Sequence, residues 1–449
     1  MSACPHRIRV LPRALVIVAS VLVFACGAGD DEATSDTPAC PVTVEDADCD
    51  TSKRPLVFVH GTLGSADNID HVALLFASNG YCADRFRAVD YNSLGGDPLA
   101  QLDALIDRLI AESGSAQVDL LAHSQGTVHA TTYLSAPAHA VKVANYLHLA
   151  GAELPANPGD VATLSLSSAA DRPVASRVTR NIVFEDLDHY EVAQSTAAFI
   201  AMYEYLNADR APPFDTIQCS RSVTIEGRVL TFPDAVALSG GMVEVYELGD
   251  APRQRSTPIH TFLVADDGAI GPWEATRGQA YELKIIPPPG DSRVPWHYYA
   301  MPFKRSDRLL RLWFRSTDPA ARRITDGISF SDQHAALLVH FKRGAFHAGR
   351  DSLRIDGFET LNTRNATPLL TTVGLLLFDD NNGGVDAAGN GISDGGALPA
   401  FAGIPFIEGS DVFMPTSPPA FIEVRFNDQV LHIPNWPSAS EGLSQILFD

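Results

Sequence analysis

A serine at the end of an apolar run is the feature that most constrains how this chain can fold. Residues 118–127 read VDLLAHSQGT and place Ser124 between the small residues Ala122 and Gly126. When a strand turns sharply into a helix, the positions two before and two after the central residue have little room for side chains. The stretch therefore predicts a strand–turn–helix corner that lifts the Ser124 hydroxyl out of a sheet, at the positive end of a helix.

The surroundings of this corner alternate between strand-like and helical stretches. From Arg54 to about Leu206, apolar runs such as PLVFVHG and VANYLHLAG alternate with amphipathic runs such as PLAQLDALIDRLIAES. Continuous apolar runs are typical of buried parallel strands, and amphipathic runs are typical of helices that cover a sheet. Residues 52–210 are therefore predicted to form an α/β domain, with a mostly parallel sheet and helices on both faces.

The pattern changes after a short linker, APPFD. From about Arg221 the apolar residues alternate with polar ones, as in MVEVYEL and YELKII, and Pro and Gly clusters separate the runs. This periodicity of two predicts all-β sandwich or barrel domains. We expect a β-sandwich over residues 218–318 and a C-terminal β domain over residues 322–449.

The N-terminus has the pattern of an export signal. A segment with three arginines precedes an apolar run that is too short to span a bilayer by itself. The end of the run, VFAC, resembles the lipobox of bacterial lipoproteins, which implies a signal peptide over residues 1–25, a lipid anchor on Cys26 and a flexible tether over residues 26–51. The expected location is the cell envelope, at the outer membrane or cell surface. Cleavage by ordinary signal peptidase and free secretion is the alternative.

Removal of the signal and lipidation of Cys26 leave an even set of four cysteines: Cys40, Cys49, Cys82 and Cys219. In an oxidising compartment such a set predicts two disulfides, although the sequence does not choose among the possible pairings. We expect the pair Cys49–Cys82, because both cysteines flank early core strands, together with the pair Cys40–Cys219.

Two further residues follow Ser124 in the order that a hydrolytic triad requires. Asp171 lies in the loop after the strand predicted by TLSLSSAADRPV, and His189, in FEDLDHYEVAQS, lies just before a predicted helix. We expect Ser124 to be a nucleophile, His189 to be its general base and later acid, and Asp171 to orient the imidazole. The alternative is that Ser124 is only a turn residue.

Other titratable residues near the triad are not expected to take part in catalysis. Asp186 and Asp188, on the loop of the expected base, are interpreted as solvated charges. His129 is expected to face away from the serine, His148 to lie in the core, and His123 to pack beside the corner.

A second glycine turn supplies the donors that acyl transfer needs. The run VFVHGTLGS ends in His60, Gly61 and Thr62. Gly61 lets the backbone bend so that the Thr62 amide can point inward, and the amide of Gln125 directly follows the serine. These two N–H groups are the expected oxyanion hole.

Together HGTLG, AHSQG, SSAAD and DLDHYE resemble the α/β-hydrolase superfamily, in particular small secreted bacterial lipases with Ala in place of the first Gly of the serine pentapeptide. The resemblance covers about residues 52–208 and implies hydrolysis of carboxylic esters of neutral, apolar substrates by a lipase or carboxylesterase. The C-terminal half resembles in outline the β-domain of two-domain long-chain lipases. TIEGRVLTFPDAVALSGGMVEVYELG also resembles a transthyretin-like or carboxypeptidase-regulatory sandwich.

Composition excludes several classes of partner and cofactor. Acidic residues number 54 against 33 basic ones, and no basic stripe indicates a nucleic-acid partner. No cofactor is expected, and neither the cysteines nor the histidines have metal-ligand spacing. The segment DDNNGGVD leaves a structural Ca²⁺ near residues 379–386 as the one metal alternative, although the Glu of a calcium loop is missing. We expect a monomer that binds a lipid or ester and reaches a membrane through its lipid anchor.

Only GAELPANPGD separates the fourth and fifth strands, where lipases often carry a helical lid. The serine is therefore expected to be open to solvent, with weak interfacial activation, unless the β domains cover the cleft. Two other functions remain as alternatives. One is an extracellular depolymerase of polyhydroxyalkanoate-type polyesters, and the other is a surface- or lipid-binding protein with a vestigial hydrolase domain.

Overall fold

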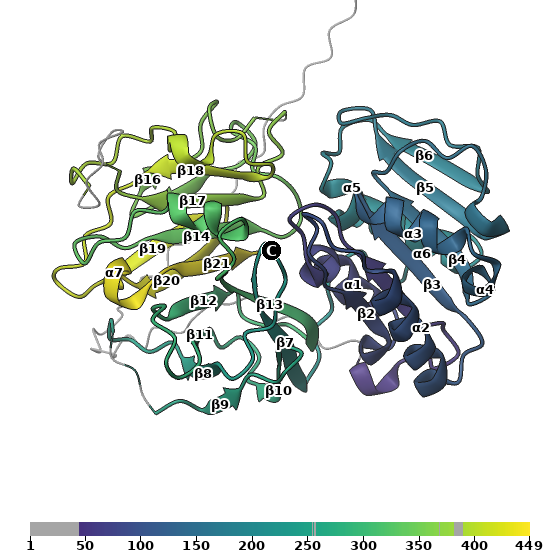
Figure 1. The fold of residues 1–449 in the computed structure, drawn as a ribbon, viewed down its shortest axis with the longest axis horizontal. Helices are drawn as coiled ribbons and strands as arrows, with labels where there is room; N and C mark the ends of the chain where they lie inside the picture. The colour runs from purple at the N-terminus through teal and green to yellow at the C-terminus, as the bar shows by residue number, and fades with distance from the viewer. Residues whose placement is uncertain (1–44, 254, 256, 368, 381–388) are drawn as a thin grey trace, which may run out of the picture. The chain divides into compact units, whose positions relative to one another are not determined.

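The computed structural model describes residues 45–253, 255, 257–367, 369–380 and 389–449 (Figure 1). The predicted signal peptide and Cys26 lie outside the described residues. None of the described helices is long and apolar enough to cross a membrane.

The first half of the chain contains a six-stranded sheet in the order β2-β1-β3-β4-β5-β6, and every pairing in it is parallel. Its strands are β1 (Leu56–Val59), β2 (Phe86–Val89), β3 (Val118–His123), β4 (Val143–Leu149), β5 (Ala162–Ser168) and β6 (Arg180–Phe184). The carboxyl ends of parallel strands share one edge of a sheet, so the loops after β3, β5 and β6 meet there.

Helices cover both faces of this sheet (Figure 1). In β1, Leu56 and Phe58 pack in one core cluster with α1 (Asp70–Ser78) and α6 (Thr196–Leu206). Val57 and Val59 pack in the opposite cluster with α2 (Leu99–Ser113) and α3 (Gly126–Leu134). Successive side chains of a strand point to opposite faces, so a strand covered on both sides is apolar throughout. The predicted α/β architecture is confirmed.

The helix expected after the His189 loop is divided in two. A short α5 (Glu191–Gln194) precedes α6, and Ser195 stands between them. The Ser195 side chain accepts a hydrogen bond from the Ala198 amide, so Ser195 acts as the N-cap of α6. A cap of this kind favours the start of a new helix.

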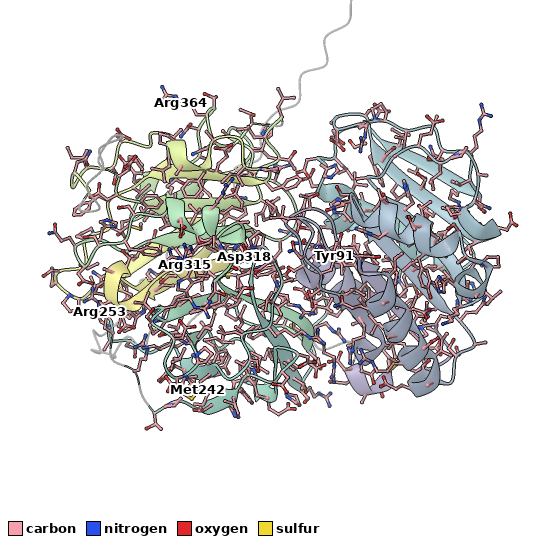
Figure 2. The ribbon with its side chains drawn as sticks, viewed as in Figure 1. Tyr91, Met242, Arg253, Arg315, Asp318 and Arg364 are labelled. Carbon is pink, nitrogen blue, oxygen red and sulfur yellow. A yellow bond between two sulfur atoms is a disulfide. The ribbon has the colours of Figure 1, made fainter. Side chains whose placement is uncertain are left out.

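The second half is built of β-strands, as predicted. In the described residues of this half, three sheets have the orders β10-β7-β13, β18-β17-β14-β21-β12-β11-β8-β9 and β16-β15-β19-β20. The strands are β7 (Val223–Phe232), β8 (Met242–Glu247), β9 (His260–Leu263), β10 (Ala269–Ala275), β11 (Tyr281–Ile286), β12 (Trp296–Ala300), β13 (Asp307–Arg315), β14 (Leu337–Phe341), β15 (Leu353–Ile355), β16 (Phe358–Glu359), β17 (Gly374–Phe378), β18 (Ile407–Asp411), β19 (Phe421–Phe426), β20 (Gln429–Pro434) and β21 (Ser444–Phe448). In Figure 2, Met242 and Arg315 lie in this half and Tyr91 lies in the parallel-sheet half.

The eight-stranded sheet crosses the predicted boundary between the two β domains. Strand β12 comes from the first β segment and β21 from the second, and they pair in parallel from His297↔Ser444 to Ala300↔Leu447. One apolar core also contains residues of both segments, such as Leu312 and Leu376. The two segments therefore share a sheet and a core.

The β half is also joined to the parallel-sheet half by buried contacts. Leu309 of β13 packs in the core beside α1 and α6. Nearby, Arg311 Nε lies 3.0 Å from both carboxylate oxygens of Asp90, and both side chains are buried. A charge pair out of reach of water is costly to break, so this contact ties the halves together.

The disulfide between Cys49 and Cys82 is confirmed, with an S–S distance of 2.07 Å. Cys219 is also disulfide-bonded. Its predicted partner, Cys40, lies outside the described residues.

Candidate active site

Ser124 lies at the corner between β3 and α3. Its φ angle is 52°, a left-handed conformation that is uncommon for a residue with a side chain, and its amide donates to the Leu149 carbonyl at 2.9 Å. A Cβ atom on Gly126 would lie 2.3 Å from the Val59 carbonyl oxygen, so only glycine fits there. Close packing of α3 against β1 thus holds the serine in its strained turn.

The structure brings the three predicted catalytic side chains together. His189 Nε2 lies 2.9 Å from Ser124 Oγ, and His189 Nδ1 lies 2.8 Å from Asp171 Oδ2. The Asp171 and His189 side chains are 28% and 12% exposed, so the imidazole is the more enclosed of the two. The hydrogen bond from His189 lowers the pKa of Asp171, which therefore stays ionised at neutral pH.

The expected oxyanion loop lies directly beside the serine. A Cβ atom on Gly61 would lie 2.8 Å from Ser124 Cβ. The Thr62 hydroxyl donates to Gln125 Oε1 at 3.0 Å, and Gln125 Nε2 donates to the Ser93 carbonyl at 3.0 Å. Within the described part of the chain, the backbone amides of Thr62 and Gln125 have no acceptor. The Gln125 side chain thus connects the two segments that supply the expected oxyanion donors.

His60 holds this loop in place through hydrogen bonds of its side chain. Its Nδ1–H donates to the Gly61 carbonyl at 2.8 Å, and its Nε2 accepts from the Tyr91 amide at 3.3 Å. The ring is fully buried and stacks on Tyr91 with 4.3 Å between centroids. Burial lowers the pKa of His60 to about 4, so the ring stays neutral and keeps both hydrogen bonds at neutral pH.

His123 has a more specific position than the packing role expected for it. Its Nε2 lies 2.9 Å from the His189 carbonyl oxygen, to which only an N–H can donate, and the two rings lie 5.0 Å apart. Burial lowers the pKa of His123 to about 3, so it is a neutral donor. His123 therefore fixes the backbone of the residue that contacts Ser124.

Asp188 corrects one interpretation of the sequence. Asp186 is exposed, as expected, but Asp188 is half-buried. Its carboxylate accepts the Glu191 amide at 2.7 Å, while Glu191 Oε2 accepts the Asp188 amide at 2.8 Å. It also accepts the Ala345 amide of the β half at 2.8 Å. Asp followed three residues later by Glu is a helix-capping pattern, which could have revealed this role.

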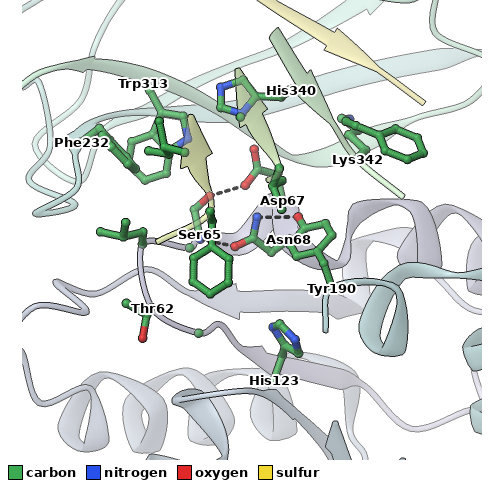
Figure 3. Close-up of a pocket in the computed structure, with 18 of the residues that line it drawn as sticks. Thr62, Ser65, Asp67, Asn68, His123, Tyr190, Phe232, Trp313, His340 and Lys342 are labelled. Carbon is green, nitrogen blue, oxygen red and sulfur yellow. Dashed lines mark hydrogen bonds between the residues drawn. The ribbon is translucent and has the colours of Figure 1, made fainter. Parts of the chain in front are cut away.

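The β half forms part of the wall of a pocket at the serine (Figure 3). The pocket encloses about 830 Å³ of space, part of it open to solvent. The β half contributes Phe232, Trp313, His340, Phe341, Lys342, Val373, Gly374, Phe406, Ile407 and Leu447. Phe406 stacks on the His189 ring with 6.1 Å between centroids. The β half therefore reaches the cleft and encloses part of it, while weak interfacial activation stays a prediction.

The remaining expectations concern metals and isolated residues. Among the described residues, no group of three or more His, Cys, Asp or Glu could hold a metal ion. The suggested Ca²⁺ loop falls mainly on residues 381–388, outside the described residues. His148 is buried, as expected. All four tryptophans are buried as well, and Trp313 lines the pocket.

By its sheet order and by the loops that carry Ser124, Asp171 and His189, the first half of the chain is an α/β-hydrolase domain. Residues 221–317 match the family described as the lipase C-terminal domain. A second family of C-terminal domains matches residues 323–449. The chain thus has an α/β-hydrolase fold followed by a segment that matches the lipase C-terminal domain, which confirms the resemblance predicted from the sequence.

Solved structures of lipases show local likeness to this chain. Aspergillus fumigatus lipase B is 13% identical over 39% of this chain and 57% of its own, with a TM-score of 0.27. A Bacillus licheniformis lipase in its propeptide form is 14% identical over 46% and 59%, with a TM-score of 0.28. The chain thus spans a little over half the length of these two relatives. A phospholipase from Legionella pneumophila is 10% identical over 60% and 97%, with a TM-score of 0.22.

Proposed function

We propose that this protein is a serine hydrolase that cleaves carboxylic esters of neutral, apolar substrates, as a triacylglycerol lipase or carboxylesterase. The observation that carries the proposal is the hydrogen-bonded chain from Ser124 through His189 to Asp171, beside a pocket with apolar walls. A serine in reach of a base that a third group orients is the arrangement that nucleophilic catalysis requires.

The geometry supports an acyl-enzyme mechanism. Ser124 Oγ attacks the ester carbonyl carbon while its proton passes to His189 Nε2, and Asp171 stabilises the imidazolium through Nδ1. The amides of Thr62 and Gln125 donate to the developing oxyanion. As the carbon–oxygen bond breaks, the alcohol takes the proton from His189. Water then attacks the acyl-enzyme with His189 as base, which releases the acid and restores Ser124.

The pocket and the charge indicate the substrate class. Trp313, Phe406, Ile407 and Leu447 supply apolar surface that suits an acyl chain. The formal net charge of −21 disfavours polyanionic substrates. Since the β half encloses part of the pocket, a flexible single ester fits this site better than the surface of a solid polyester.

Hydrolysis of p-nitrophenyl esters with acyl chains of two to sixteen carbons tests the proposal. The protein would be made from Gly27 onward and compared with a Ser124→Ala variant. We expect turnover that falls by several orders of magnitude in the variant, roughly 10³-fold or more. A maximum at eight carbons or more would identify a lipase, and a maximum at two to four carbons would favour an esterase or polyesterase. Equal rates for both proteins would contradict the proposal.

Two further proposals concern the oligomeric state and the cellular location of the protein. We propose a monomer that is exported and held at the cell envelope by lipid on Cys26, as the VFAC motif suggests. Detection of acylated Cys26 in membrane fractions would test the anchor, and the absence of acylated Cys26 there would contradict it.

A binding protein with a vestigial hydrolase domain is disfavoured, because a domain without catalytic activity would not need the 2.9 Å contact between Ser124 Oγ and His189 Nε2.

A further inference from the structure

The pocket beside Ser124 contains polar groups that the ester-hydrolysis mechanism does not use. Asp67, in the short helical turn Ala66–Ile69 (η2), lines the pocket. Its Oδ1 accepts a hydrogen bond from the Ser65 hydroxyl. Its Oδ2 has no hydrogen-bond partner within the described part of the chain. Asp67 is half-buried, so this oxygen can accept a hydrogen bond from a group that enters the pocket.

A second polar group comes from the β half. His340 of β14 also lines the pocket, and among the described residues its buried Nε2 has no hydrogen-bond partner. Strand β14 pairs with β17 so that His340 lies opposite Gly374. A Cβ at Gly374 would lie 3.5 Å from His340 Cε1, in ordinary van der Waals contact, so the glycine places no side chain of its own against this edge of the ring.

The two groups lie away from the reacting atoms. In Figure 3, His123 and Thr62 lie at one side of the pocket and His340 at the opposite side, with Asp67 and Ser65 between them. Lys342 also lines the pocket, but its ammonium is paired with Asp70 and lies 4.0 Å from Asp307. Asp67 Oδ2 and the His340 ring are therefore polar groups of the pocket that the described residues leave without a hydrogen bond, and His340 lies on the side away from His123 and Thr62.

We propose that Asp67 and His340 form a subsite that hydrogen-bonds a free hydroxyl group on the ester substrate. A hydroxyl can donate to Asp67 Oδ2, and its oxygen or proton can pair with Nδ1 of the His340 ring, the ring nitrogen that is not among the buried atoms. The proposal rests on the proposed ester hydrolase function and narrows its substrate class. The hydroxyl could belong to the alcohol, as in a partial glyceride, or to the acyl chain, as in a hydroxy fatty ester.

Matched pairs of esters test the subsite and separate the two sources. The first pair is 1-monooctanoylglycerol and propyl octanoate, which differ only in hydroxyls on the alcohol. The second pair is ethyl 3-hydroxyoctanoate and ethyl octanoate. The measured quantity is the ratio of kcat/KM within each pair, so that overall losses of activity cancel.

We expect the ratio of at least one pair to fall by about threefold to tenfold in His340→Leu and in Asp67→Ala, the range of one ordinary hydrogen bond. The variants His340→Gln and Asp67→Asn, which retain hydrogen-bonding groups, should recover part of the ratio. Val373→Ala, on the apolar wall, serves as the control and should change both members of a pair by the same factor. Which pair responds identifies the position of the hydroxyl.

Two results would overturn the subsite. If the wild-type protein hydrolyses all four esters and neither ratio changes in His340→Leu or Asp67→Ala, the subsite is absent while the ester hydrolase function stands. If none of the four esters is hydrolysed although short p-nitrophenyl esters are, the subsite fails and the hydrolase function stands; if the p-nitrophenyl esters are not hydrolysed either, both fail. Circular dichroism of each variant would show that a changed ratio comes from a folded protein.

Discussion

Asp171 contributes to the site through its carboxylate oxygen, which lies 2.8 Å from His189 Nδ1. That contact selects the tautomer in which Nε2 is free to accept the Ser124 proton. The loop of His189 is held independently, by His123 at its carbonyl and by Asp188 at the start of α5. The position of the imidazole and its protonation thus depend on different residues.

An Asp171→Asn variant separates these two contributions. The amide can donate to Nδ1 and favour the wrong tautomer, so kcat should fall by roughly 10³- to 10⁴-fold while KM changes little. Steady-state kinetics on one p-nitrophenyl ester would measure both constants. A loss of less than tenfold would show that Asp171 does not orient the base.

Asp67 is a single residue whose effect on stability should depend on pH. Burial raises its pKa to about 6 from a usual value near 3.8. Between about pH 4 and pH 6 the folded state therefore binds more protons than the unfolded state, and this group lowers stability as the pH rises. Relative to Asp67→Asn, the wild-type protein should be less stable at pH 7 than at pH 4. Urea denaturation of both proteins would measure this, and a difference that does not change with pH would contradict the burial of the carboxyl.

Among the elements, the glycine turn after β1 is the one that lies directly against the side chain of Ser124. A Cβ atom on Gly61 would lie 2.8 Å from Ser124 Cβ and 3.4 Å from Ser124 Oγ. Gly61→Ala should therefore displace the nucleophile or the Thr62 amide and reduce kcat by roughly 10²-fold or more, as the loss of an oxyanion donor does.

A nearby glycine supplies the control for this variant. Gly95 lies in the exposed loop next to Ser93, and a Cβ there would meet nothing within 4 Å. Gly95→Ala should keep nearly full activity, with both variants compared by kcat and by circular dichroism. Equal activity of the two variants would show that the turn after β1 does not approach the serine as closely as the structure has it.

Sequence patterns predicted strands, helices and turns well where a short stretch of residues determines the local structure. The apolar runs and amphipathic stretches located the strands and helices of the parallel sheet, and the small residues around Ser124 located the corner. The division of α5 from α6 was missed because Ser195 was counted as part of one amphipathic stretch. Asp188 was missed because its capping partner, Glu191, was not considered together with it.

At the scale of the whole molecule, the pocket depends on contacts between residues far apart in the chain. Phe406 stacks on His189, and β21 joins strands from both β segments. Periodicity fixes which residues of a strand are apolar but does not identify the strand or loop that they will meet. The shared eight-stranded sheet and the pocket wall of the β half were therefore beyond prediction from the sequence.

The Arg311–Asp90 pair tests how strongly the halves are joined. Arg311→Met would leave a buried carboxylate without its cation, and the free energy of unfolding should fall by about 3 to 5 kcal/mol. Denaturant titration would measure it. In the double variant Asp90→Asn with Arg311→Met, which removes both charges, much of this stability should return. A loss below about 1 kcal/mol would indicate that the pair is not shielded from water.

The most direct test of the central claim is covalent labelling with a fluorophosphonate, followed by intact-protein and peptide mass spectrometry. Such a reagent is attacked by an activated serine, so it reports the Ser124–His189 contact without any assumption about the natural ester. We expect one phosphonyl adduct per chain, on Ser124, with no adduct in Ser124→Ala and very slow labelling in His189→Ala. Labelling that is unchanged in Ser124→Ala, or its absence from the wild-type protein, would contradict the assignment of Ser124 as the nucleophile.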